Sequence, residues 1–171
     1  MLDNIRRFSL KKSIERNLQK RDISQRNEPL VYLGFLVDEN LQKNLQPFYE
    51  FSKELGLKEK DVKIFTFIET KRRIPTLRNN QISNKEFTLR GEIDNQNASE
   101  FLDFPFDVLV GLYKGKHTFL DAMVSKSKAK FKIGFKDADA RLYDLLINVQ
   151  PSNLEITKNE IEKYLKILNK I

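Results

Sequence analysis

The residues that could bind a ligand are mainly cations, and they follow apolar runs that read as strands. The clearest case is Tyr-Lys-Gly-Lys-His at residues 113–117, which follows the run from Phe106 to Leu112 and contains the only histidine. Cationic side chains bind phosphate, and the helix predicted to begin near Thr118 would add its positive end. We therefore predict an anion-binding site composed of Lys71, Arg72, Arg73, Lys114, Lys116, His117 and Lys136. The alternative is that these are ordinary solvated loop residues.

No complete catalytic or cofactor motif is present. The segment from Gly111 to Thr118 is similar to a phosphate-binding P-loop, but only three residues separate its glycines, and His117 replaces the Ser or Thr that must follow the lysine. The absence of cysteine excludes a thiolate catalyst, and one histidine excludes a multi-histidine metal site within one chain. The sequence thus predicts no catalytic residue, no metal site and no cofactor. Enzymatic activity stays open, with a non-enzymatic role favoured.

Apolar runs predict about five strands, at residues 30–37, 62–68, 106–112, 130–135 and 143–149. Runs without polar alternation are typical of strands covered on both faces, so the first, third and fifth should be central. Helices are predicted between the strands, and alternating strands and helices imply a parallel sheet. The predicted fold class is a Rossmann-like three-layer α/β sandwich with a mainly parallel sheet and a basic N-terminal helix.

Three further expectations concern particular segments. Thr157 begins a Thr-x-x-Glu capping box, and Leu165 and Leu168 of the helix that follows are predicted to pack on the sheet. Segment 69–100 is predicted to be the least ordered part, with a short edge strand or hairpin arm at 87–93. The carboxyl ends of parallel strands meet at one edge, so the loop cations should converge there.

The positive charge is concentrated at the N-terminus. Residues 1–26 contain eight cations and three acids, and so carry +5 of the net charge of +7. We predict a basic arm over 1–26 and a single α/β domain over 27–171, with an acidic partner for the arm. The arm residues are Arg6, Arg7, Lys11, Lys12, Arg16, Lys20 and Arg21. The alternative is a solvated helix that caps the domain through a stripe of Leu10, Ile14 and Leu18.

Four stretches carry a resemblance to known families: FDVLVGLY, SKAKFKIGF, LYDLLINV and EIEKYLKILNKI. Together they resemble an uncharacterised family of small α/β proteins from Bacteroidota, a domain of unknown function. The FDVLV strand and the AKFKIGF strand are also similar to the N-terminal half of heptosyltransferase-like glycosyltransferases. The second resemblance implies no catalytic residue here, since those enzymes hold their sugar nucleotide with a second domain.

These observations favour a non-catalytic binding or adaptor module for an anionic partner, with RNA or a ribonucleoprotein preferred. One alternative is a glycosyltransferase-like or nucleotide-handling domain that acts with a second chain, and another is a protein–protein scaffold. The charged N-terminus lacks the apolar core of a signal peptide, and no apolar run is long enough for a transmembrane segment. The expected location is therefore cytoplasmic. Oligomeric state stays open.

Overall fold

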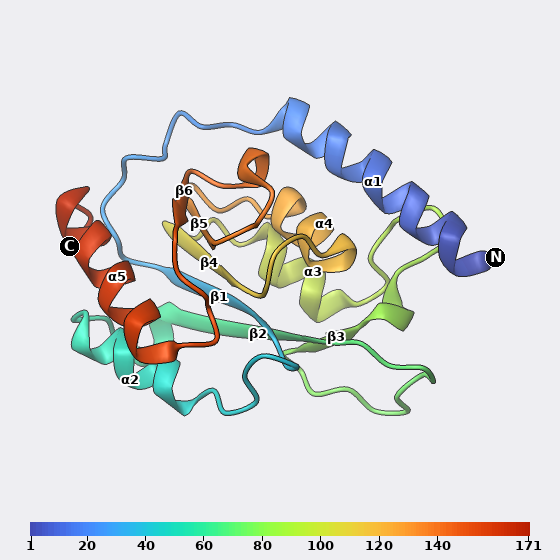
Figure 1. Cartoon of the computed structure of the whole chain (residues 1–171), viewed down its shortest axis with the longest axis horizontal. Helices are drawn as coiled ribbons and strands as arrows, with labels where there is room; N and C mark the ends of the chain where they lie inside the picture. The colour runs from blue at the N-terminus through green and yellow to red at the C-terminus, as the bar shows by residue number, and fades with distance from the viewer.

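The computed structural model describes all 171 residues and contains one six-stranded sheet in which every neighbouring pair of strands is parallel (Figure 1). The strands lie in the order β3-β2-β1-β4-β5-β6. Their bounds are Leu33–Asp38 for β1, Val62–Ile68 for β2, Gln81–Ser83 for β3, Val108–Leu112 for β4, Lys132–Phe135 for β5 and Leu145–Ile147 for β6. The predicted α/β class with a parallel sheet is confirmed, with six strands instead of about five.

Five helices surround the sheet, and they form two hydrophobic cores. Side chains of α2 and α5 pack on one face, and those of α3 and α4 pack on the other (Figure 1). Helix α1 lies over α4 as an additional outer element. The helices span Leu2–Lys20 (α1), Gln46–Glu54 (α2), Gln96–Asp103 (α3), Thr118–Lys126 (α4) and Leu154–Ile167 (α5). None of them combines the length and the apolar character needed to cross a membrane.

Two of the three strands predicted to be central hold that position. β1 and β4 are neighbours in the middle of the sheet, and their apolar residues are buried because helices cover both faces. The prediction for residues 143–149 is wrong, since β6 lies at the edge of the sheet and Leu146 is 37% exposed. Its apolar run resembles that of a central strand because Leu142 and Tyr143, before the strand, are buried in one core, while Leu145 and Ile147 of the strand pack in the other.

Segment 69–100 is ordered despite its polar composition. It contains the edge strand β3 and the helix α3, which begins where the Asn95 side chain accepts a hydrogen bond from the backbone N–H of Ala98 (2.9 Å). Phe87 and Ile93 form one antiparallel bridge, so the hairpin expected at 87–93 is reduced to a single pair. Ile82, Phe87 and Ala98, which lie far apart in the segment, are buried in the core and hold it on the domain. The polar composition of the segment does not reveal these contacts.

Helix α5 begins one turn earlier than the capping box predicted. The side chain of Asn153 accepts a hydrogen bond from the N–H of Ile156 (3.3 Å), whereas Thr157 is buried inside the helix. Asn is as good an N-cap as Thr, and the earlier start lets Ile161 and Leu165 reach the core. Leu168 follows the last helical residue and is 42% exposed, so the prediction that it packs on the sheet is wrong.

Helix α4 is buried on all sides, which explains the position of α1. Every residue from Phe119 to Ser125 is buried, so α4 needs cover on the side opposite the sheet. α1 supplies it with buried Leu10 and Ile14 and with a hydrogen bond from Asn17 Nδ2 to Ser125 Oγ (3.1 Å). The N-terminal helix therefore packs on the domain, as in the capping alternative. Whether residues 27–171 fold without it stays a prediction.

The backbone of α1 also approaches the loop before α3 closely. A Cβ atom at Gly91 would lie 2.9 Å from the carbonyl carbon of Ser9, and Gly91 has a φ of +79°. Both the close approach and the left-handed conformation favour glycine at this position. Gly91 thus marks a second contact that holds α1 against the domain.

The contact between α1 and α4 predicts the effect of shortening Leu10. Leu10→Ala should lower the free energy of unfolding by roughly 2–5 kcal/mol, because it leaves a cavity beside a fully buried helix. Leu2→Ala, on the exposed side of the same helix, should change it by less than about 0.5 kcal/mol. Urea denaturation of both variants measures the difference. Equal effects would mean that α1 does not hold α4 in place.

The end of α5 gives a second stability prediction. Leu165→Ala should lower the free energy of unfolding by roughly 2–5 kcal/mol, because Leu165 is fully buried against the sheet. Leu168→Ala should change it by less than about 1 kcal/mol, since the side chain already contacts solvent. Chemical denaturation that gave the larger loss for Leu168 would contradict the observed end of the helix.

Candidate functional site

The carboxyl edge of the sheet is where parallel α/β folds bind ligands, at the point where strand order reverses. Here that point lies between β1, which ends at Asp38, and β4, which is followed by the loop to His117. Burial raises the pKa of Asp38, and burial lowers the pKa of His117, although the charge of Asp38 acts against that lowering. An acid and a base with displaced pKa values thus flank the switch point.

His117, at the start of α4, is one of the residues that the sequence predicted for the site. Its Nδ1 accepts a hydrogen bond from the N–H of Leu120 (3.2 Å), and its own backbone N–H donates to Asp121 (3.0 Å). The ring packs edge-on against Phe67 with centroids 5.1 Å apart. Side chains of His117 and Asp121 therefore cap the start of α4 and accept hydrogen bonds from two of its backbone N–H groups. Fewer N–H groups are left for a phosphate at this helix end than the sequence predicted.

A buried chain of hydroxyl groups supports this helix start. Tyr143 donates to the hydroxyl of Tyr113 (2.6 Å), which donates to the carboxylate of Asp121 (2.6 Å). Burial raises the pKa of both tyrosines and of Asp121. The Tyr143 ring lies against β5, where a Cβ atom at Gly134 would approach it to 2.7 Å. These residues tie β4, β5 and α4 together, which is a structural role.

Carboxylates occupy the inner part of this edge. Glu39 is buried and accepts hydrogen bonds from Thr66 Oγ1 and Gln81 Nε2 (both 2.8 Å), and it also pairs with Arg78. Glu69, after β2, pairs with Arg7 of α1 at 3.2 Å. The inner edge is therefore acidic and internally paired, whereas the sequence indicated an edge dominated by cations.

The predicted loop cations stand outside this inner layer. Lys71, Arg72 and Arg73 are exposed on the loop after β2, where Arg73 lies 3.8 Å from Glu86. Lys114 and Lys136 are exposed on two other loops. Of the predicted loop cations, only Lys116 lines a cavity together with His117. The seven predicted residues are thus on the same edge of the sheet without forming one pocket.

That cavity, the histidine cavity, lies between α1, the start of α4 and the turn Ala140–Leu142, and has a volume of about 550 Å³. Its cations are two arm residues, Lys11 and Lys12, together with Lys116 and Arg141. Arg141 is paired with Glu15 (2.7 Å) and Asp139 (2.8 Å). The lining contains these four cations and three acids, Glu15, Asp121 and Asp139, so the cavity carries one net positive charge.

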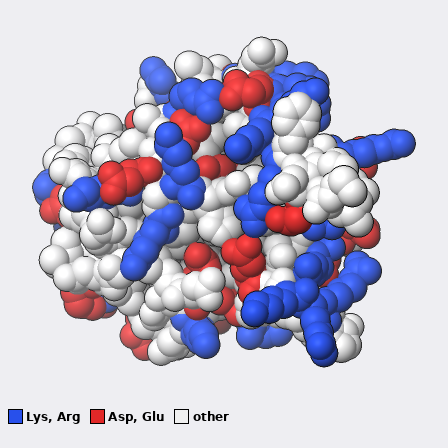
Figure 2. Space-filling view, turned by 45° about the vertical axis from the view of Figure 1, so that its right-hand side comes forward, with Lys and Arg blue, Asp and Glu red and all other residues white.

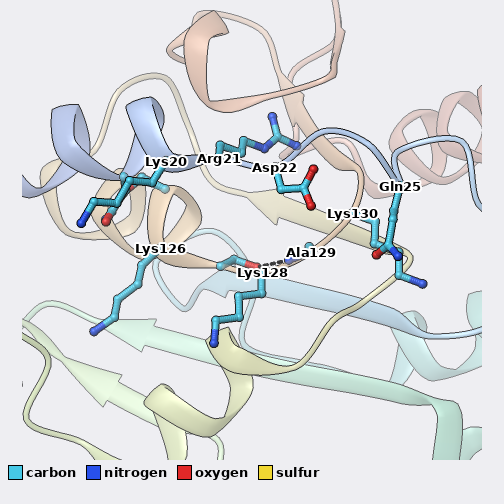
Figure 3. Close-up of a pocket in the computed structure, with 11 residues that line it drawn as sticks. Lys20, Arg21, Asp22, Gln25, Lys126, Lys128, Ala129 and Lys130 are labelled. Atoms are coloured by element: carbon cyan, nitrogen blue, oxygen red, sulfur yellow. Dashed lines mark hydrogen bonds between the residues drawn. The ribbon is translucent and has the colours of Figure 1, made fainter.

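A second cavity, the lysine cavity, lies at the other end of α4 and has a volume of about 380 Å³ (Figure 3). It is lined by five cations and one acid, Asp22, from the end of α1 and from the loop between α4 and β5. The cations are Lys20, Arg21, Lys126, Lys128 and Lys130. Both helices end here, so the cations also face the negative ends of two helix dipoles.

The five cations differ in how far they are neutralised. Arg21 pairs with Asp144, Lys128 with Asp103 (3.3 Å) and Lys130 with Asp107 (2.9 Å). No carboxylate lies within ion-pair distance of Lys20 or Lys126, and Nε of Arg21 is buried without a hydrogen-bond partner. The sequence did not single out Lys126, at the end of α4, or Lys128 and Lys130 of the loop that follows, although their spacing of two residues was a visible signal.

Of the predicted arm cations, three are internally paired. Arg6 and Arg7 contact Asp3, and Arg21 contacts Asp144. The exposed cations without a carboxylate partner are Lys11, Lys12, Arg16 and Lys20. Figure 2 shows that Lys and Arg side chains form separate groups on the face it presents, with acids between them, so the surface is not uniformly basic. No group of three or more His, Cys, Asp or Glu side chains is placed to hold a metal ion.

Lys132 continues the lysine series but points into the core. It is 1% exposed, and its Nζ donates to the carbonyl of Val124 in the last turn of α4 (2.5 Å). The pKa of Lys132 is lowered to about 7, mainly by burial and also by the nearby charge of Arg21, while the charge of Asp144 acts in the opposite direction. The amine therefore donates a hydrogen bond to a backbone carbonyl at the end of α4, but its burial there makes it lose its proton near neutral pH.

This buried amine predicts how stability depends on pH. An unfolded lysine keeps its proton up to about pH 10.4. Between about pH 7 and 9 the unfolded chain thus binds more protons, and the free energy of unfolding should rise with pH by up to about 1.4 kcal/mol per unit. Lys132→Met should flatten that rise. Urea denaturation at several pH values tests this, and parallel curves for the two proteins would contradict it.

Comparison with known families places the chain in one of them. Residues 6–168, nearly the whole chain, match a family of unknown function (DUF6913). Comparison with curated proteins and with solved structures gave no match. The similarity to heptosyltransferase-like enzymes stays a prediction. The predicted resemblance to an uncharacterised family is confirmed, and the chain belongs to the family of unknown function DUF6913.

Proposed function

We propose that this protein is a non-catalytic RNA-binding module, and that it binds RNA along α1. The observation that carries the proposal is a row of cations without carboxylate partners on one side of that helix. Lys12, Arg16 and Lys20 are exposed and follow one another at four-residue spacing. Each step advances about 6 Å along the helix axis, which places three free charges in line.

The row connects the two cavities described above. Lys12 lines the histidine cavity at one end, and Lys20 lines the lysine cavity at the other. A basic track between two cation-lined hollows suits a polyanion better than a single small anion, because successive phosphates can each meet a charge. α1 is also held on the domain by Leu10 and Ile14, so the backbone that carries these cations does not have to become ordered when a partner binds.

The salt dependence of RNA binding tests this proposal. Substituting Lys12, Arg16 and Lys20 by Gln should weaken binding of a short single-stranded RNA. It should also reduce the slope of log affinity against log salt by about 2, the value expected for three lost phosphate contacts. Fluorescence anisotropy between about 50 and 200 mM salt measures both quantities.

A matched control removes the same number of charges elsewhere. Lys158, Lys163 and Lys166 lie on α5, on the opposite face of the sheet, and pair with Glu155 (2.9 Å), Glu160 (3.0 Å) and Glu162 (2.6 Å). Their substitution by Gln should leave the slope nearly unchanged. Equal losses in both triple variants would mean that net charge alone governs binding. Absence of RNA binding by the unmodified protein would exclude the proposed function.

The switch point favours a second candidate, a nucleotide-handling domain that acts with another chain. Asp38 and His117 flank the strand-order reversal, the place where open parallel sheets bind ligands, and their pKa values are displaced in opposite directions. A nucleotide that bound there would raise the melting temperature in a concentration-dependent way, and Asp38→Asn would reduce that shift. A melting temperature that does not respond to nucleotides would remove this candidate.

A further inference from the structure

Phe8 is an exception among the phenylalanines of this chain. Of the 13 phenylalanines, Phe8 is the only exposed one, at 59%, whereas the others are buried or half-buried in the two cores. It lies on α1 and lines the histidine cavity. An exposed aromatic ring in a cation-lined hollow has no role in packing the domain, which indicates a role in binding.

We propose that the histidine cavity receives an unpaired nucleobase of the RNA, which stacks on Phe8. The inference rests on the proposed RNA-binding function, and it predicts that the protein prefers single-stranded RNA to duplex RNA. Single-stranded nucleic acids are bound by aromatic side chains set in basic grooves, because every base offers a flat face for stacking. A base inside a duplex is already stacked and paired, and a side chain cannot reach its face.

The surroundings of Phe8 suit a base with a phosphate at either side. Lys12 Nζ lies 4.6 Å from the centroid of the Phe8 ring, and Lys11 and Lys116 line the same cavity without carboxylate partners. The carboxylates of Glu15 and Asp139 are held by Arg141. The cavity, with four cations and three acids, thus carries one net positive charge beside an apolar ring, and a nucleotide can use both features.

The cavity also contains a donor for a base edge. His117 Nδ1 accepts a hydrogen bond from Leu120, so in the neutral ring Nε2 carries the proton. Burial lowers the pKa of His117 and so favours that neutral form. The volume of about 550 Å³ falls within the range of roughly 300–1,000 Å³ usual for ligand pockets.

A lipid surface is the main competing partner, because Leu2 and Ile5 are also exposed on the N-terminal half of α1. A bilayer would need the ring on an open convex face. Phe8 instead borders a hollow that α4 and the turn Ala140–Leu142 wall on the other side. The geometry therefore favours a flat group that enters the cavity edge-first.

The absence of tryptophan provides a direct probe of stacking. Phe8→Trp introduces a single indole, whose emission should be quenched by a short single-stranded RNA and little affected by a duplex of the same length. The matched control is Ile156→Trp, at a position 47% exposed on α5 across the sheet. Its emission should not respond to either RNA. Equal quenching by single-stranded RNA at both positions would overturn the proposal. Emission of the Phe8→Trp variant that shifts to the blue with anionic vesicles, and is not quenched by RNA, would overturn it as well.

Affinity measurements separate this inference from the proposed function. Phe8→Ala should weaken single-strand binding roughly 5- to 150-fold, the loss of one stacked base, and leave the salt slope unchanged. The melting temperature should not change, since the ring is exposed. Unaltered affinity in Phe8→Ala would overturn the stacking inference while leaving RNA binding intact. Absence of RNA binding by the unmodified protein would overturn both.

Discussion

The burial of α4 on every side is the constraint on which the arrangement of this molecule depends. Phe119 to Ser125 leave no polar face for water, so the sheet must cover one side of the helix and another element must cover the other. α1 is that element, and its Leu10 lies fully buried in the same core. A segment that resembles a detached basic arm is thereby fixed on the domain, with its orientation set by α4.

This packing also determines where positive charge is available. The start of α4 meets α1 at the histidine cavity, and its end meets the last turn of α1 at the lysine cavity. The two cavities lie at the two ends of α4, and both are lined by cations from segments far apart in sequence. Apart from Lys116, the predicted cations on the loops after β2, β4 and β5 remain solvated, because no neighbouring element packs against them. The cation-lined cavities therefore lie beside the outer helix α1, whereas the sequence predicted the cations to converge at the sheet edge.

The carboxyl edge of the sheet has a different character. Glu39 accepts hydrogen bonds from Thr66 and Gln81, and Asp121 accepts one from Tyr113, whose hydroxyl accepts one from Tyr143. These buried hydrogen bonds stabilise the strand ends and the start of α4. Asp38 and His117 remain as an acid and a base with displaced pKa values beside the strand-order reversal. A fixed cationic helix above an acidic, internally bonded edge suits the binding of an extended anion outside the sheet, which supports the RNA-binding proposal more than a phosphate held at the strand ends.

The sequence determined the fold class, the strands β1, β2, β4 and β5 and the approximate ends of α1, because continuous apolar runs and helical spacing act over short distances. It also selected Lys116 and His117 as candidate site residues, and the structure places both in one cavity. Tertiary structure alone decided that β6 is an edge strand, that β3 and α3 form within a polar segment and that Leu168 is exposed. It also decided which cations are free, since Arg7, Arg21 and Lys128 pair with carboxylates of distant segments, whereas the pairs with Asp3 follow from helical spacing. The physical reason is that periodicity records how a segment folds, whereas burial and charge pairing depend on which distant segment packs against it.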